Sequence, residues 1–118
     1  MAEYQLTDLS KAFAVDIINL CETVRGRGKA IAVINQLLRS GTSIGTNIHE
    51  ANYASSRADF INKLQIALKE CYESDYWLDI FHAANMITDD EYKAMFAKCS
   101  KIRKMLIASV ATAKRKTD

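Results

Sequence analysis

The chain has 118 residues, of which 16 are Lys or Arg and 14 are Asp or Glu, so its formal net charge is +2. This length suits one domain, residues 1–118, and is too short for two ordinary domains. Hydrophobic residues make up 49% and charged residues 25%, a balance that excludes a disordered chain. The absence of proline argues against short strands joined by tight turns and favours a few long helices.

The first predicted helix covers residues 5–25. Its apolar residues recur at steps of three or four and form one stripe, namely Leu6, Leu9, Phe13, Ile17, Leu20 and Val24. Gly26 and Gly28 follow, and glycine supplies the backbone freedom that a helix end needs. The sequence therefore predicts a turn directly after residue 25.

The second predicted helix covers residues 29–53 and contains Gly41 and Gly45, four positions apart. Glycine in a helix interior costs about 1 kcal/mol relative to alanine. We expect a neighbouring helix to approach closely at these two positions; a locally weak or kinked helix is the alternative.

A polar line also runs along this helix and consists of Arg39, Ser43, Asn47 and Glu50. At 100° per residue these side chains fall within about 80° of one another. One interpretation is a solvated face. The other is a hydrogen-bonded stripe at a seam between helices or subunits, where Arg39 would fork onto a carboxylate.

The third predicted helix, residues 57–84, is apolar on two sides. One face carries Phe60, Ile61, Leu64, Ala67, Leu68, Cys71 and Leu78, and a second face carries Ile66, Trp77, Ile80 and Phe81. A small bundle can cover only one face, so we expect the second face to form an oligomer interface. The alternative is a tilted helix that slides between its neighbours in a monomer.

Asp75 and His82 fall in line with the core face of that helix. A buried aspartate needs a partner, and Arg39 or Arg103 would serve. The alternative is that this end of the helix is solvated.

The fourth predicted helix covers residues 88–114 and begins with Thr88 and Glu91 in the spacing of a capping box. Three short turns between four helices imply antiparallel neighbours. The predicted fold is therefore all-α, an antiparallel up-down-up-down four-helix bundle.

Positive charge is concentrated in two segments, with a net +3 over residues 25–53 and +4 over residues 85–118. Candidate contacts to nucleic-acid phosphate are Arg25, Arg27, Lys29, Lys114, Arg115 and Lys116. The alternative is an ordinary solvated face, because cations near a helix C-terminus are favoured by its dipole.

The sequence gives little sign of catalytic chemistry. His49 and Glu50 do not belong to an HExxH motif, and neither a glycine-rich phosphate loop nor a zinc-type cysteine pair is present. We therefore expect a non-enzymatic protein without cofactor or metal. Cys21, Cys71 and Cys99 are expected to be buried thiols.

Targeting signals are equally sparse. Acidic residues interrupt the first twenty positions, and no apolar run reaches the roughly 18 residues that span a bilayer. We expect a cytoplasmic protein with no membrane contact.

The segment from Gln36 to Ala51, QLLRSGTSIGTNIHEA, resembles the helix-two signature of the four-helix bundle proteins encoded by intervening sequences within bacterial 23S ribosomal RNA genes. The segment Phe60 to Leu68, followed by Glu73 and Tyr76-Trp77-Leu78, resembles the helix-three pattern of that family. The predicted bundle is also similar to the accessory variability determinant of diversity-generating retroelements.

The resemblance implies a bundle that assembles into a homo-oligomeric ring, typically a pentamer. It also implies that Arg39, Ser43, Asn47, Glu50 and Glu73 are the polar positions of the family. Two functions follow as hypotheses. One is an accessory protein that associates with RNA or DNA, whose weak basic patches would be multiplied by a ring. The other is a structural or protein-interaction scaffold.

Overall fold

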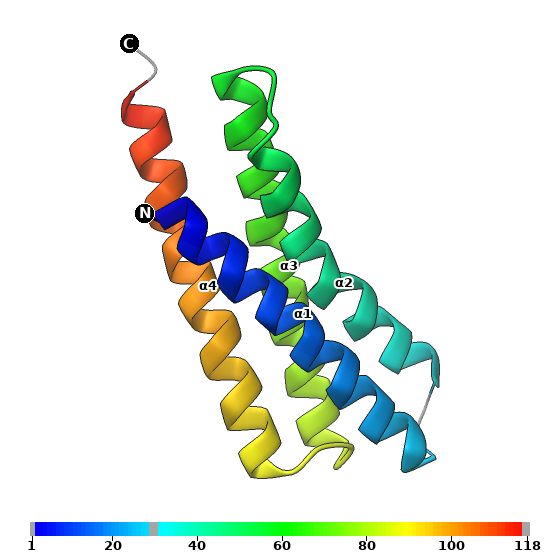
Figure 1. Ribbon diagram of the computed structural model, residues 1–118. Helices are drawn as coiled ribbons and strands as arrows, with labels where there is room; N and C mark the ends of the chain where they lie inside the picture. The colour runs from blue at the N-terminus through cyan, green and yellow to red at the C-terminus, as the bar shows by residue number, and fades with distance from the viewer. Residues whose placement is uncertain (1, 29–30, 117–118) are drawn as a thin grey trace.

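The computed structural model describes residues 2–28 and 31–116, which form four α-helices and no strand. These are α1 (Ala2–Gly26), α2 (Ile31–Ala51), α3 (Arg57–Ala83) and α4 (Asp89–Arg115). Each helix packs beside the next, and α4 returns beside α1, which makes an up-down-up-down bundle of 52 × 21 × 19 Å (Figure 1). The predicted fold class is confirmed. Across the described ranges, no helix is long and apolar enough to cross a membrane.

The helix bounds differ from the predicted ones mainly at α1 and α2. Helix α1 begins at Ala2, earlier than residue 5, and α2 ends at Ala51 rather than at residue 53. The amides of Asn52 and Tyr53 donate to the carbonyl oxygens of His49 and Glu50 at 3.2 and 3.0 Å, so the last turn tightens and stops. The predicted start of α2 at Lys29 lies outside the described residues.

One apolar stripe from each helix fills the core. The largest fully buried side chains are Phe13, Phe81, Leu6, Ile17, Ile34, Leu37, Ile44, Ile48, Leu78, Ile102, Leu106 and Val24. Phe81 is 0% exposed, so its assignment to the outer face of α3 is wrong. Phe81 lies four residues from Trp77 and three from Leu78, so it stands at the border of the two apolar faces of α3. Its side chain is packed in the core of the bundle.

The turns follow the capping chemistry of the sequence. Ser56 accepts a hydrogen bond from the amide of Asp59 at 3.1 Å at the start of α3. Thr88 and Glu91 form a reciprocal capping box at the start of α4. Asn85 takes a left-handed φ of 60° after α3, and the amide of Met86 donates to the carbonyl of Phe81, which closes a Schellman-type helix end.

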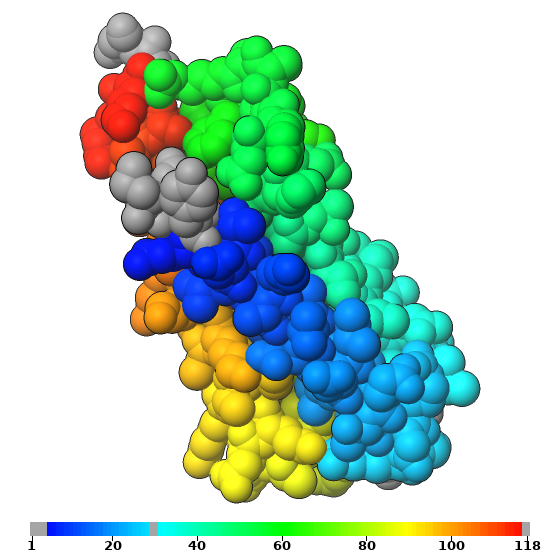
Figure 2. All heavy atoms as spheres, in the orientation of Figure 1, coloured from blue at the N-terminus to red at the C-terminus, as the bar shows by residue number. Residues whose placement is uncertain are grey.

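Helix α1 begins part-way along α4, so the last turns of α4 extend beyond it (Figures 1 and 2). The bundle is consequently more open at the end formed by the α2–α3 turn and the C-terminus of α4. The opposite end is closed by the α3–α4 turn, where Met86 and Ile87 are buried.

Candidate functional site

The polar line of α2 lies at its seam with α3. The Arg39 guanidinium pairs with Glu70 at 3.1 Å and also with Glu73, and Glu73 in turn accepts a 3.1 Å hydrogen bond from the indole of Trp77. The hydrogen bond from Arg39 lowers the pKa of Glu73, and the one from Trp77 acts in the same direction. Arg39 therefore forks onto two carboxylates that stand one turn apart on α3.

The other members of the line are held by their own helix. The hydroxyl of Ser43 donates to the backbone carbonyl of Arg39 at 2.7 Å. The side-chain amide of Asn47 donates to the backbone carbonyl of Ser43 at 2.9 Å. Glu50 pairs with Lys63 of α3 at 3.1 Å. Arg39 and Glu50 thus form ion pairs across the contact between α2 and α3, and both remain partly exposed to solvent. Each of the two interpretations of the polar line is therefore correct in part.

A hydroxyl pair lies in the core between the same two helices. Ser74 donates to Ser40 at 2.9 Å, and both residues are 0% exposed. Each hydroxyl in a dry core needs a partner, and this pair satisfies that need across the seam. Together with the ion pairs it fixes the register of α3 against α2.

Asp75 pairs with Arg103 of α4, one of the two partners predicted for it. The distance is 3.1 Å, and the side chains are 17% and 18% exposed. Burial raises the pKa of Asp75, although Cys99 and Arg103 oppose that rise. Among the described atoms, the second carboxylate oxygen of Asp75 has no hydrogen-bond partner. His82 lies farther along α3, where its ring contacts Asp89 at 2.6 Å and stacks on Tyr92.

The basic residues of the first turn are engaged within the chain. Arg27 pairs with Glu91 through both guanidinium nitrogens, at 3.0 and 2.9 Å, and also donates to the carbonyl of Met86. Arg25 pairs with Glu22 at 2.7 Å and contacts Asn35. Arg27 therefore ties the α1–α2 turn to the start of α4. Lys29 lies outside the described residues.

The two predicted basic clusters do not meet within one chain. The α1–α2 turn and the C-terminal end of α4 lie at opposite ends of the molecule (Figure 2). Lys114, Arg115 and Lys116 are exposed at the α4 end. A single chain thus presents two separate basic ends.

Helix α4 carries a longer basic surface than its C-terminal cluster. Between residues 92 and 116 the chain has eight Lys or Arg and no Asp or Glu. Arg103 is 18% exposed and pairs with Asp75, and Lys98, which is 52% exposed, pairs with Asp16. We call the remaining exposed cations the α4 basic face, which consists of Lys93, Lys101, Lys104, Lys114, Arg115 and Lys116.

The outward face of α3 carries aromatic and aliphatic side chains among its polar ones. Tyr72 and Tyr76 are 53% and 57% exposed, and Ile66, Trp77 and Ile80 are half-buried beside them. Trp77 packs partly against the core and meets the ring of Tyr76 edge-on. Of the four residues predicted for an oligomer interface, Phe81 is buried in the core. Ile66, Trp77 and Ile80 remain partly accessible.

Comparison with known proteins places the chain in a family. The family model described as 23S rRNA-intervening sequence protein matches residues 2–108. The chain belongs to this family. It is also 44% identical to a crystallised protein of unknown function from the S23 ribosomal protein family of Bacteroides thetaiotaomicron, with a TM-score of 0.92 over 94% of this chain and 99% of that one. No curated protein matches the chain.

In this intervening-sequence family member, the described residues include no group of three or more His, Cys, Asp or Glu placed to hold a metal ion. The three cysteines are buried thiols, and burial raises the pKa of Cys21 to about 11. A thiol that stays protonated is a poor nucleophile. The Cys21 thiol is therefore not activated as a nucleophile.

Sequence reasoning missed Glu70, Lys63 and the serine pair. Glu70 stands three residues before Glu73, so the helical spacing could have placed both beside Arg39. Lys63 could not be assigned to Glu50 without the register of the two helices. The exposed lysines in the middle of α4 were visible as a run without acids, but the periodicity alone did not separate them from Lys98 and Arg103.

Proposed function

We propose that this family member is a non-enzymatic, RNA-associated accessory protein that contacts phosphates through the α4 basic face. One observation carries the proposal: the outer side of α4 presents six cations along a stretch without a single acid. Backbone phosphates are bound mainly by such surfaces, without regard to sequence.

We assign different roles to the two basic clusters named from the sequence. Arg25 and Arg27 already have carboxylate partners, which reduces what they can offer to a phosphate. Lys101 and Lys104 make no ion pair within the described residues and remain exposed. The centre of the proposed RNA contact is therefore the middle and C-terminal half of α4.

Charge reversal tests this assignment. The double variant Lys101→Glu/Lys104→Glu should weaken binding of a labelled RNA hairpin by at least tenfold in a fluorescence anisotropy titration, since it removes two phosphate contacts and adds repulsion. The matched control is Lys11→Glu/Asn19→Asp/Gln36→Glu, which makes the same change in net charge at exposed sites on α1 and α2. Equal losses in both variants, or no binding by the unaltered protein, would contradict the proposal.

The outer face of α3 favours a second role, that of a homo-oligomeric scaffold. Its half-exposed Ile66, Trp77 and Ile80 are flanked by two exposed tyrosines, and aromatic residues are enriched at protein interfaces. A ring, pentameric in the arrangement that the sequence resemblance implies, would bury this face and repeat the α4 basic face in every subunit. The scaffold and the RNA contact are thus compatible.

A further inference from the structure

A groove lies at the open end of the bundle, between the start of α1, the start of α3 and the last turns of α4. Its volume is about 680 Å³, within the range of about 300–1,000 Å³ that is usual for small-ligand sites. We call it the end groove; the described residues that line it are Gln5, Arg57, Phe60, Met105, Ala108, Ser109, Thr112, Ala113 and Lys116.

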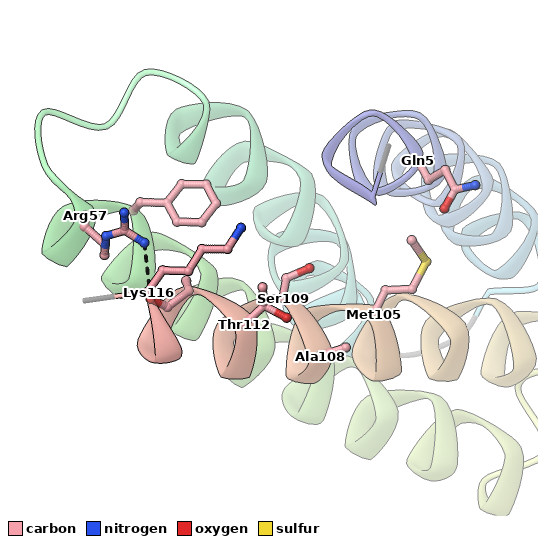
Figure 3. Close-up of a pocket in the computed structure, with 9 residues that line it drawn as sticks. Gln5, Arg57, Met105, Ala108, Ser109, Thr112 and Lys116 are labelled. Atoms are coloured by element: carbon pink, nitrogen blue, oxygen red, sulfur yellow. Dashed lines mark hydrogen bonds between the residues drawn. The ribbon is translucent and has the colours of Figure 1, made fainter. Parts of the chain in front are cut away.

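The lining changes character along the groove. Arg57 and Lys116 lie near one end, Gln5 and Met105 lie toward the other, and Ser109 and Thr112 stand between them (Figure 3). Arg57 donates one hydrogen bond to the carbonyl of Ala113 at 3.4 Å, which leaves its other donors available. The described lining residues thus combine two cations, two hydroxyls and one amide, with no carboxylate.

The floor of the groove is apolar and includes an aromatic ring. Phe60 is partly buried, packs against the core and also lines a small hollow beneath, next to Leu6 and Ile48. Met105 and Ala108 supply the rest of the apolar surface on the α4 side. A flat apolar body with an anionic group at one end fits such a lining by shape and by charge.

We propose that the end groove binds one unstacked nucleotide of single-stranded RNA. The base lies on Phe60 and the apolar α4 surface, its polar edge meets the hydroxyls and Gln5, and its phosphate pairs with Arg57 and Lys116. Aromatic stacking combined with phosphate contact is the general means by which proteins hold unpaired bases. The inference rests on the proposed RNA association and adds that unpaired segments are preferred over duplex.

The groove opens beside the α4 basic face, because Lys116 belongs to both. A strand whose phosphates follow that face would therefore reach the groove without leaving the protein. The basic face alone would bind duplex and single strand alike, since it reads only phosphate. The end groove supplies the preference for an unpaired base.

Two substitutions test the groove. Phe60→Leu keeps an apolar side chain but removes the ring, and Thr112→Glu puts a carboxylate in the middle of the lining. Each should weaken binding of a labelled 12-nucleotide single strand at least about fivefold, the lower end of the loss expected for one base–aromatic stack. Phe60→Leu should leave binding of the matching duplex unchanged. Thr23→Glu, at an exposed site on α1 toward the other end of the bundle, is the matched control and should leave single-strand binding unchanged.

A direct measurement uses adenosine 5′-monophosphate and decanoate as separate probes in amide chemical-shift titrations. The nucleotide should shift the amides of Ser109 and Thr112 in the unaltered protein, and Phe60→Leu should reduce the shifts. Shifts with decanoate alone would make the groove a site for amphiphilic carboxylates and overturn the inference. Single-strand affinities of Phe60→Leu and Thr112→Glu equal to that of Thr23→Glu would also overturn it, while leaving the α4 basic face intact. Failure of the unaltered protein to bind either form of RNA would instead contradict the RNA association itself.

Discussion

At the scale of single residues, Asp75 and Arg103 form the least exposed ion pair of the described residues. Both side chains are less than one-fifth exposed, and burial dominates the raised pKa of Asp75. The free energy of the pair is therefore a balance between desolvation and attraction. The sequence identified Asp75 as a residue that needs a cation, but it left Arg39 and Arg103 as equal choices. Only the register of α4 against α3 decides between them.

Removal of that cation should destabilise the fold in a pH-dependent way. We expect Arg103→Met to lower the free energy of unfolding by about 2 kcal/mol at pH 7, because it leaves a carboxylate buried without its partner. Burial raises the pKa of Asp75 even with Arg103 present, and loss of the guanidinium should raise it further. The stability of the variant should therefore fall as the pH rises from the unfolded to the folded pKa of Asp75, and should be recovered in acid. Urea unfolding at pH 7 and pH 4 measures both effects.

The control for this variant is Arg115→Met, which removes a cation from an exposed position on the same helix. It should change the free energy of unfolding little at either pH. If Arg103→Met lowered the free energy of unfolding by the same amount at pH 4 as at pH 7, relative to the unaltered protein, the role assigned to Asp75 would be contradicted.

At the scale of helices, α1 and α2 meet closely at Gly41. A Cβ atom there would lie 2.8 Å from Cγ1 and 3.0 Å from Cγ2 of Ile17, a side chain that is itself fully buried. At Gly45 the nearest atom would be the carbonyl oxygen of Ser10 at 3.4 Å, which is ordinary contact. The close approach of a neighbouring helix that the sequence predicted thus leaves no room for a side chain at Gly41, whereas a methyl group fits at Gly45.

The two glycines should respond oppositely to alanine. Gly41→Ala should lower the free energy of unfolding by roughly 1–3 kcal/mol, because overpacking against Ile17 exceeds the gain in helix propensity. Gly45→Ala should be neutral or stabilising by up to about 1 kcal/mol. Thermal and urea unfolding of both variants measures the difference. A stabilised Gly41→Ala protein would contradict the packing of α1 on α2.

The sequence predicted the elements better than the contacts between them. Apolar spacing located the four helices, and the Thr88–Glu91 box marked the start of α4 correctly, because these signals are local. The ion pair between Arg27 and Glu91 joins positions 64 residues apart, and nothing local predicts it. Phe81 was misplaced for a related reason: a residue at the border of two apolar faces turns inward or outward according to the neighbouring helix.

At the scale of the whole molecule, the outer face of α3 bears on assembly. Tyr76 is 57% exposed, so its substitution removes apolar surface without opening the core. Tyr53 is 77% exposed at the α2–α3 turn and serves as a matched site away from that face. The assembly hypothesis therefore allows one chemical change to be compared at two positions.

Tyr76→Glu should convert the proposed homo-oligomer into smaller species, because a charge desolvated at an interface is costly. Tyr53→Glu should keep the mass of the unaltered protein. Light scattering coupled to size-exclusion chromatography gives both masses directly. Equal masses for the two variants would contradict an interface on the outer face of α3, and a monomeric unaltered protein would contradict the scaffold role as a whole.

The RNA contact is the central claim, and its salt dependence is the most direct test. For unaltered protein and a labelled RNA, the logarithm of affinity should fall linearly with the logarithm of salt concentration. For a single strand with about four phosphates contacted, affinity should drop roughly 50-fold between 50 and 200 mM salt. The slope should flatten in Lys101→Glu/Lys104→Glu and stay unchanged in Lys11→Glu/Asn19→Asp/Gln36→Glu. A salt-independent affinity, or the same slope in all three proteins, would contradict the assignment of RNA binding to α4.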